Sequence, residues 1–391
     1  MTAQPASSLG AVRYSQIREI AEEAMRMEGV LALYFGESNR PTPQFVKDAA
    51  AQAMADGFTL YTSNAGLPSL REGLADYYRR LRGIELDPLR EIVVHASGVQ
   101  ALAVAIRCLL DPGDEAIILT PVWPNGAGAV AMANATPVEV EQPLVDGRYA
   151  IDVDAIAAAI TPRTRFVLLT SPSNPLGWVA TDEELQALLE LCRERGLWLL
   201  CDEVYERLYW RDGRLGEPAP SVLTHAMRDD AVIVTQSFSK SYCMTGWRVG
   251  WIVARADLAA KAMQLNEITV SCAAGFAQKA AEAALAHGEP SLLELLEDLK
   301  ASRDLCLDGL RTMPGVTVPE PDGAFYLFPR IEGLGDSLEF CRALLREEKV
   351  GLAPGKAFGK GGDGSVRLCY ASERHILEEA LERLGRFVER R

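Results

Sequence analysis

Residues 165–204, RFVLLTSPSNPLGWVATDEELQALLELCRERGLWLLCDEV, contain two short apolar runs on either side of an amphipathic stretch. The runs RFVLLT and LWLLCDEV are typical of buried strands. The stretch between them is typical of a helix, with Thr181 as its N-cap and Gly196 at its end. Continuous apolar strands separated by helices indicate a mainly parallel sheet covered on both faces.

The same alternation of strand and helix signals extends from about residue 50 to residue 270. Further strands are expected at 91–97, 115–121, 231–237 and 246–254. After residue 275 the pattern changes to long helices with short strands between them. We therefore expect a large α/β domain over 46–275 and a smaller α+β domain formed by residues 1–45 and 276–391.

The composition indicates which kinds of partner and which cellular location to expect. The 391 residues carry 54 acidic and 40 basic side chains and a net charge of −14, which disfavours nucleic acid and membrane surfaces as partners. No stretch approaches the roughly 18 apolar residues of a membrane span, and residues 1–10 lack the features of a signal peptide. Eight cysteines without a CxxC pair and four scattered histidines indicate free thiols and no metal site. We expect a cytoplasmic protein.

Several expected strands end in polar or aromatic residues. In open α/β sheets ligands bind beyond the carboxyl ends of the strands, where Ser97, Trp123, Asn174, Asp202 and Lys240 would meet. A small loop at a helix start, hydroxyl groups and an arginine suit a phosphate group. A carboxylate, an aromatic plate and an amine suit a heteroaromatic ring that carries an aldehyde. These residues therefore predict a site for a phosphorylated ring.

Nine segments resemble, in family order, the motifs of the class I/II pyridoxal-phosphate-dependent aminotransferases. They are FGESNRPTP (35–43), YTSNAGLPSLRE (61–72), SGVQAL (97–102), PVWPNG (121–126), SPSNPLG (171–177), DEVYERL (202–208), SFSKSYCMTGWRVG (237–250), PDGAFYLFP (321–329) and SVRLCYA (365–371). The resemblance covers nearly the whole chain and implies the fold-type-I, aspartate-aminotransferase-like α/β architecture. It also implies a ping-pong transfer of the amino group of an L-amino acid to a 2-oxo acid.

The resemblance assigns five residues to the cofactor ring. Lys240 would form a Schiff base with pyridoxal 5'-phosphate and later move the proton at the substrate α-carbon. Asp202 would pair with the pyridine nitrogen, and Trp123 would stack on the ring. Tyr205 and Asn174 would hydrogen-bond to the phenolic oxygen of the cofactor. On this basis the catalytic residues are Lys240, Asp202 and Tyr205.

The remaining cofactor residues resemble a phosphate cradle. This set consists of Ser97, Gly98, Val99, Ser237, Ser239 and Arg248. Tyr61 resembles a family tyrosine that reaches the phosphate of the neighbouring subunit. The resemblance therefore implies a homodimer with shared active sites.

The substrate carboxylate would be held by the guanidinium of Arg367 and the N–H of Gly36, beside Trp123 and Asn174. Val99 stands where some relatives that accept aspartate carry a lysine, which weakens the case for a dicarboxylic substrate. Arg40 either meets an acidic side chain of the substrate or faces water. The side-chain pocket, with Tyr34, Leu67, Trp123 and Phe325, suits neutral or aromatic substrates.

Three alternatives remain at this level. A lyase or synthase using the same cofactor, such as a carbon–sulfur lyase, would keep Lys240, Asp202 and Arg367. A non-enzymatic ligand-sensing module is disfavoured by the acidic composition and by a match that begins within the first 40 residues. A nicotinamide or nucleotide enzyme is disfavoured because no GxGxxG or Walker-type loop follows the early strands.

Overall fold

A computed structural model describes residues 10, 12, 14–211 and 215–391, so most of the 1–10 segment lies outside it. Its centre is a seven-stranded sheet. In spatial order the strands are β2 (Ile92–His95), β10 (Gly250–Ala254), β9 (Val232–Ser237), β8 (Trp198–Asp202), β7 (Thr164–Thr170), β3 (Glu115–Thr120) and β4 (Thr136–Glu141). The five strands from β9 to β4 are parallel, and β10 is antiparallel to both its neighbours. The predicted mainly parallel sheet is confirmed.

Both faces of the sheet are buried. On β8, Leu199 and Cys201 belong to one hydrophobic cluster, whereas Leu200 belongs to the cluster on the opposite face. Alternate side chains of a strand point to opposite faces, so this division places a core on each side. The surrounding helices are α3 (Pro68–Arg82), α4 (Gly98–Leu109), α5 (Asn125–Met132), α6 (Val153–Ala159), α7 (Asp182–Arg195) and α8 (Ala256–Thr269).

The crossover between β7 and β8 forms as the sequence predicts. Thr181 caps α7 by accepting a hydrogen bond from the backbone N–H of Glu184, whose side chain bonds back to the N–H of Thr181. Gly196 ends the helix with a positive φ of 64°, a conformation that glycine adopts without strain. Pairs of this kind satisfy backbone groups that a helix end leaves unpaired.

One expected strand is shorter than predicted. Of 246–254 only β10 (Gly250–Ala254) is extended. Thr245–Trp247 form a 3-10 turn and Arg248 has a left-handed φ of 56°, which interrupts the extended backbone.

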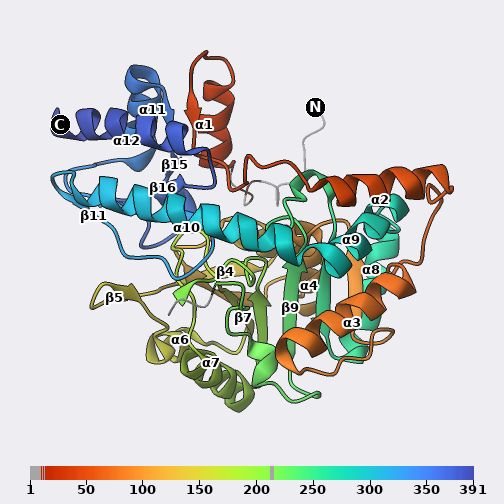
Figure 1. Ribbon diagram of the computed structural model, residues 1–391. Coiled ribbons are helices and arrows are strands. Elements are labelled where there is room, and N and C mark those ends of the chain that lie inside the picture. Colours follow the sequence, from red (N-terminus) through yellow and green to blue (C-terminus); the bar gives the residue numbers. More distant parts are fainter. Residues whose placement is uncertain (1–9, 11, 13, 212–214) are drawn as a thin grey trace, which may run out of the picture.

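The C-terminal part forms a separate group of helices and short strands (Figure 1). Its helices are α10 (Glu289–Arg311), α11 (Ser337–Glu348) and α12 (Arg374–Glu389), whereas α9 (Gly275–His287) packs against α3 of the large domain. Its three-stranded sheet has the order β12 (Tyr326–Leu327), β16 (Val366–Cys369) and β15 (Ala353–Pro354). In Figure 1, α10 runs between this group and the large sheet.

The N-terminal segment lies with the C-terminal group. Strand β1 (Leu31–Ala32) pairs in parallel with β14 (Val350–Gly351), and α1 (Gln16–Ala24) packs beside α11. Helix α2 (Gln44–Ala55) packs against α9. Two short pairings complete the fold: β5 (Leu144–Val145) with β6 (Arg148–Tyr149), and β11 (Val316–Thr317) with β13 (Arg330–Ile331).

None of the helices in the described residues is both long enough and apolar enough to cross a membrane.

Candidate active site

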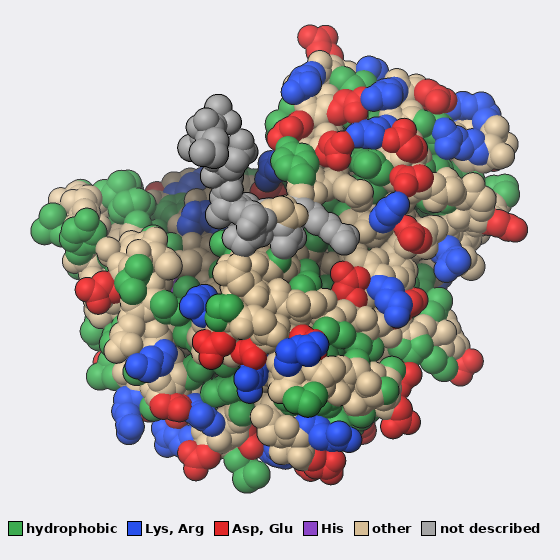
Figure 2. Space-filling model, turned by 180° about the vertical axis from the view of Figure 1, so that it is seen from behind, with side chains coloured by type: hydrophobic (Ala, Val, Ile, Leu, Met, Phe, Trp, Pro, Cys, Tyr) green, Lys and Arg blue, Asp and Glu red, His purple; other side chains and the backbone are tan. Residues whose placement is uncertain are grey.

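A cavity of about 720 Å³ opens beyond the carboxyl ends of β7, β8 and β9. Figure 2 shows a hollow in this face, with basic side chains inside it. The predicted site residues that line the cavity are Gly36, Gly98, Val99, Trp123, Asn174, Asp202, Tyr205, Ser237, Ser239, Lys240, Arg248 and Arg367. Ser97 lies directly beside it as the N-cap of α4. Tyr61 does not line the cavity of this chain and is 88% exposed.

Lys240 follows β9 and places its amine in the cavity. The amine donates a hydrogen bond to the carbonyl oxygen of Gly36. Its nitrogen lies 5.6 Å from the ring centroid of Tyr205 and 5.7 Å from that of Phe325. Burial lowers the pKa of Lys240 to about 8. A lysine with a lowered pKa has a larger neutral, nucleophilic fraction near neutral pH.

Asp202 is the last residue of β8 and is only 5% exposed. Its carboxylate accepts a hydrogen bond from the hydroxyl of Thr235 at 3.2 Å. Burial raises the pKa of Asp202 to about 6. Within the described part of the chain it forms no ion pair, so a cationic group of a ligand would supply the missing partner.

The N-terminus of α4 and the segment after β9 form a compact donor site. A Cβ atom added to Gly98 would lie 3.0 Å from the Cβ of Ser237, and one added to Gly250 would lie 2.4 Å from the backbone nitrogen of Gly98. The Ser237 hydroxyl donates to that of Ser239 at 2.9 Å. The close backbone packing brings helix N–H groups and hydroxyls together.

Arg248 completes this donor site. Its guanidinium donates to the carbonyl oxygen of Thr245 and has no carboxylate partner among residues 14–211 and 215–391. An arginine, two hydroxyls and a helix N-terminus match the hydrogen-bonding needs of a phosphate dianion.

Arg367 is a further buried cation of the cavity lining. It is 2% exposed, and its guanidinium donates to Asn174 Oδ1 at 2.8 Å and to the carbonyl oxygen of Tyr34. Its Nε is buried and has no hydrogen-bond partner in the described structure, and no described carboxylate pairs with it. A buried guanidinium with this free donor capacity suits the carboxylate of a ligand.

The structure adds cavity residues that the sequence analysis did not name, some of them within the recognised segments. Tyr14, Ser15, Ile17 and Arg18, in and before α1, line the cavity together with Phe35, Glu37, Thr245 and Tyr326. The α1 residues have an ordinary amphipathic helix pattern, so no motif marks them. Tyr326 lies in the recognised segment 321–329, and its hydroxyl is 2.7 Å from that of Tyr205.

Three uncertain pocket residues are now placed. Arg40 forms an ion pair with Asp298 of α10 and does not line the cavity. Leu67, the N-cap of α3, and Phe325 do not line the cavity of this single chain, so their assignment to the pocket stays a prediction. Phe325 packs edge-on against Tyr205, with 5.5 Å between the ring centroids, and its own ring centroid lies 5.7 Å from the Lys240 nitrogen.

The donor set fits a pyridoxal phosphate molecule. A phosphate-type cradle at Arg248 and a buried carboxylate at Asp202 line the same cavity as the Lys240 amine, and neither Arg248 nor Asp202 has an ionic partner among the described residues. Fold and site together define a class: an α/β enzyme that holds a phosphorylated cationic ring beside a reactive lysine.

Comparisons with known proteins carry this further. The chain matches the family model "Aminotransferase class I and II" over residues 31–384. It is 33% identical to an aspartate aminotransferase of Pyrococcus horikoshii over 382 residues, covering 97% of this chain and 95% of the relative. It is 37% identical to the aspartate aminotransferase of Geobacillus stearothermophilus, covering 95% of both chains.

Solved structures agree. The aspartate aminotransferase of Thermus thermophilus with maleate has a TM-score of 0.90 and 32% identity, covering 99% of this chain and 100% of that one. The corresponding enzyme of Rhizobium meliloti has a TM-score of 0.92 and 32% identity over the full length of both chains.

The chain belongs to the class I and II aminotransferase family. It is an aminotransferase that uses pyridoxal phosphate, and the predicted fold, enzyme class and cofactor are confirmed. The named relatives do not support the lyase or ligand-sensing alternatives.

Proposed function

We propose that the enzyme transfers the amino group of a neutral or aromatic L-amino acid to a 2-oxo acid, with Lys240 as cofactor anchor and proton carrier. The observation that carries this proposal is the position of the Lys240 amine in one cavity with Asp202, Arg248 and Arg367. Pyridoxal phosphate, when bound, supplies an aldehyde for the amine and a cationic ring that withdraws electrons from the substrate α-carbon.

On the cofactor side, cationic and hydroxyl groups would bind the phosphate, and a carboxylate would bind the ring nitrogen. Arg248, Ser237, Ser239 and the N-terminus of α4, with Ser97, Gly98 and Val99, would bind the phosphate. Asp202 would hold the proton on the ring nitrogen, and this contact would return the pKa of its carboxyl toward the ordinary range. Trp123 would cover the ring, and Tyr205 and Asn174 would donate to its phenolic oxygen.

The residues on the substrate side account for a two-stage reaction. The amino-acid donor and the 2-oxo-acid acceptor share an α-carboxylate, which Arg367 and the N–H of Gly36 would hold in both stages. The same clamp would bring the α-carbon of either substrate to the Lys240 amine, which would remove or return a proton there.

The preference for neutral or aromatic side chains rests on the cavity wall. Tyr34, Phe35, Val99 and Trp123 provide an apolar lining, and Arg40 is engaged by Asp298. A relative from Thermococcus litoralis, 32% identical and covering 96% of both chains, is named an aromatic-amino-acid aminotransferase.

A dicarboxylic substrate is the second candidate. Arg18 lines the cavity and lies 5.0 Å from the ring centroid of Phe35, and it forms no ion pair within the described residues. Arg18→Met would raise the KM for aspartate and glutamate but leave that for phenylalanine unchanged if Arg18 binds a second carboxylate. Arg26→Met, a change outside the cavity lining, serves as the control.

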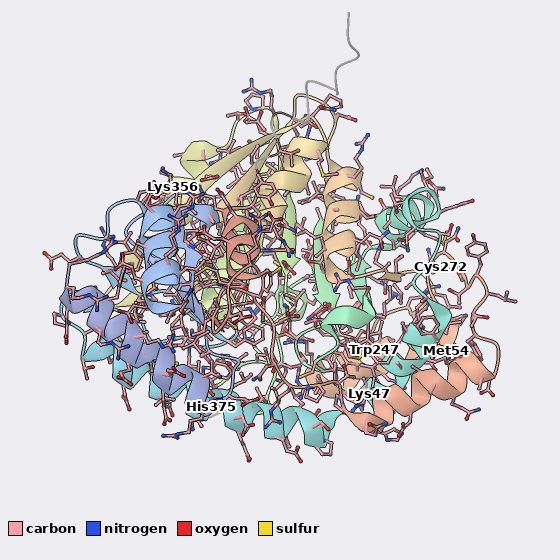
Figure 3. All side chains as sticks on the ribbon, turned by 90° about the horizontal axis from the view of Figure 1, so that it is seen from above. Lys47, Met54, Trp247, Cys272, Lys356 and His375 are labelled. Atoms are coloured by element: carbon pink, nitrogen blue, oxygen red, sulfur yellow. The ribbon has the colours of Figure 1, made fainter. Side chains whose placement is uncertain are left out.

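We also propose a homodimer, and an exposed apolar patch supports it. The connection between α2 and α3 and the end of α8 expose Met54, Phe58, Leu60, Tyr61, Met263, Ile268 and Val270. Leu60, Tyr61 and Ile268 are 81%, 88% and 82% exposed. Hydrophobic side chains gather at the edge of the molecule that carries α2 and α8 in Figure 2. Figure 3 shows Met54 of α2 at the same end of the molecule as Cys272, which follows α8.

An apolar patch of this kind usually marks a protein interface. Burial against a second copy would remove these side chains from water and bring Tyr61 toward the phosphate of the neighbouring site. Leu60→Glu should convert dimer to monomer in sedimentation experiments and weaken cofactor binding. An unchanged dimer would contradict this assignment.

Two further expectations belong to the proposal. The pairing of β1 with β14 supports a small domain made of residues 1–45 and 276–391 beside a large domain over 46–275. We also propose a cytoplasmic location, which eight cysteines without disulfide partners would suit.

The role of Lys240 as cofactor anchor can be tested by trapping its covalent bond to the cofactor. Borohydride treatment of the yellow holoenzyme should fix the cofactor on Lys240, and mass spectrometry should locate the adduct there. Lys240→Ala should lose the adduct and about 10²–10⁴-fold or more of the activity. An adduct at another lysine would overturn the role of Lys240. A screen of amino donors against pyruvate and 2-oxoglutarate would then decide the substrate class.

A further inference from the structure

Tyr326 lies between the cofactor side and the substrate side of the cavity. It belongs to β12 and is fully buried. Its hydroxyl oxygen lies 2.7 Å from the hydroxyl oxygen of Tyr205, and the Arg367 guanidinium lies 4.6 Å from its ring centroid. A Cβ atom added to Gly36 would lie 2.1 Å from the Tyr326 hydroxyl. One side chain therefore contacts a proposed cofactor ligand and both groups of the proposed carboxylate clamp.

The surroundings of the Tyr326 hydroxyl indicate where its proton points. A tyrosine hydroxyl carries one proton and can also accept hydrogen bonds. Tyr205 is its only hydrogen-bond partner in the described part of the chain, and the backbone at Gly36 closes off another side. If Tyr326 donates to Tyr205, the Tyr205 proton is free for an acceptor in the cavity.

We propose that Tyr326 is a positioning residue whose hydroxyl donates to Tyr205 and thereby aims the Tyr205 proton at the phenolic oxygen of the cofactor. The proposal rests on the proposed role of Tyr205. Hydrogen bonds in a chain polarise and strengthen one another, so donation from Tyr326 also makes Tyr205 a stronger donor.

The consequence reaches the nitrogen of Lys240. A strong donor to the phenolic oxygen withdraws electron density that would otherwise hold a proton on the neighbouring nitrogen. Tyr326 therefore lowers the proton affinity of the cofactor-bound Lys240 nitrogen.

The other charged or titratable groups near the two tyrosines are Asp202, Lys240, Arg367 and Cys369. Tyr326→Phe leaves all four in place. It removes one oxygen atom and keeps the ring beneath Arg367 and beside Gly36.

The experiment is a pH titration of the visible absorbance of the holoenzyme, which reports the protonation of the Lys240 nitrogen. It compares wild type, Tyr205→Phe, Tyr326→Phe and the double variant. Tyr205→Phe should raise the apparent pKa most, and Tyr326→Phe should raise it by about 0.5–1 unit, the range expected for one hydrogen bond. The double variant should titrate like Tyr205→Phe alone, since Tyr326 acts through Tyr205.

The matched control is Tyr370→Phe. Tyr370 is also fully buried and donates its hydroxyl to the carbonyl oxygen of Ala324 at 3.3 Å. It has no hydrogen bond to Tyr205, so its loss should leave the titration unchanged. Tyr326→Met, which also lacks the hydroxyl, takes the place of Tyr326→Phe if that variant does not fold.

The outcomes separate the two levels of inference. A shift in Tyr205→Phe with none in Tyr326→Phe would overturn the role of Tyr326 and leave that of Tyr205 intact. Additive shifts in the double variant would also overturn it, because Tyr326 would then act independently. No shift in Tyr205→Phe would overturn the proposed cofactor contact itself. A second readout is the dissociation constant of pyridoxal phosphate, which should rise in Tyr326→Phe and remain unchanged in Tyr370→Phe.

Discussion

Asp202 and Glu203 are neighbours in the chain, but their carboxylates lie in different surroundings. Asp202 faces the cavity and has no ionic partner in the described residues. Glu203 accepts hydrogen bonds from the Ser221 hydroxyl at 2.8 Å and the Val222 N–H at 3.2 Å. It belongs to a buried cluster in which Arg82 pairs with Glu206 at 2.6 Å.

The difference separates two uses of buried charge. In the Arg82–Glu206 cluster the chain itself supplies the counter-charge, so the charges hold elements of the fold together. In the cavity, Asp202, Arg248 and Arg367 are left for groups that the chain does not provide. We therefore expect substitutions in the cavity to damage binding and catalysis, and substitutions that break the Arg82–Glu206 pair to damage stability.

The largest effect should come from Asp202→Asn. If Asp202 pairs with the ring nitrogen as proposed, removing its charge should lower kcat by about 10²–10³-fold, the range for loss of one preorganised electrostatic contact. Because burial raises the pKa of Asp202 to about 6, the ionised carboxylate is unfavourable in the cofactor-free fold above that pH. The cofactor-free variant should be at least as stable as wild type at pH 7.5 in urea unfolding. A large loss of stability there would break the comparison.

Arg82→Met should do the reverse. Loss of one partner of a buried pair leaves the Glu206 carboxylate uncompensated and should cost about 3–5 kcal/mol of unfolding free energy. The folded fraction should bind pyridoxal phosphate with the affinity of wild type, measured by visible absorbance. Glu206→Gln in the same background should recover part of the stability, since it removes the stranded charge.

Glu203→Gln should change the free energy of unfolding least, and the size of this change should depend on pH. Burial raises the pKa of Glu203 to about 7, above its unfolded value. The neutral form is therefore favoured in the fold, and wild type should lose stability relative to the variant as pH rises from about 4.5 to 7, by about 1–3 kcal/mol. Parallel stability curves for the two proteins would show that Glu203 does not titrate in this range.

Regular elements of the fold were predictable because their signals are local. The apolar runs of 165–204, the cap at Thr181 and the glycine at 196 act within one helix or strand, and the structure forms them as expected. The strand expected over 246–254 is shorter in the structure because Arg248 has a left-handed φ, which interrupts the extended backbone before Gly250. Backbone conformations of this kind leave little trace in hydrophobic patterning.

The cavity residues were predictable as far as recognised motifs reach. Lys240, Asp202 and Arg367 could be predicted because strand ends and family motifs mark their positions. The structure brings all three together in one cavity. The direction of Arg40 was open, since it depends on Asp298, which is remote in sequence. The hydroxyl pair of Tyr326 and Tyr205 likewise depends on packing between β12 and the segment after β8, which no local pattern encodes.

The pairing of β1 with β14 has a consequence for synthesis of the chain. The backbone of residues 31–33 is hydrogen-bonded to Lys349 and Gly351, and Cys369 donates to Leu33. A chain still emerging from the ribosome lacks these late partners, although Gly36 has already been translated. The proposed clamp for the carboxylate can therefore assemble only after residue 369 has been translated, and removal of residues 349–391 should abolish it even where the large sheet has folded.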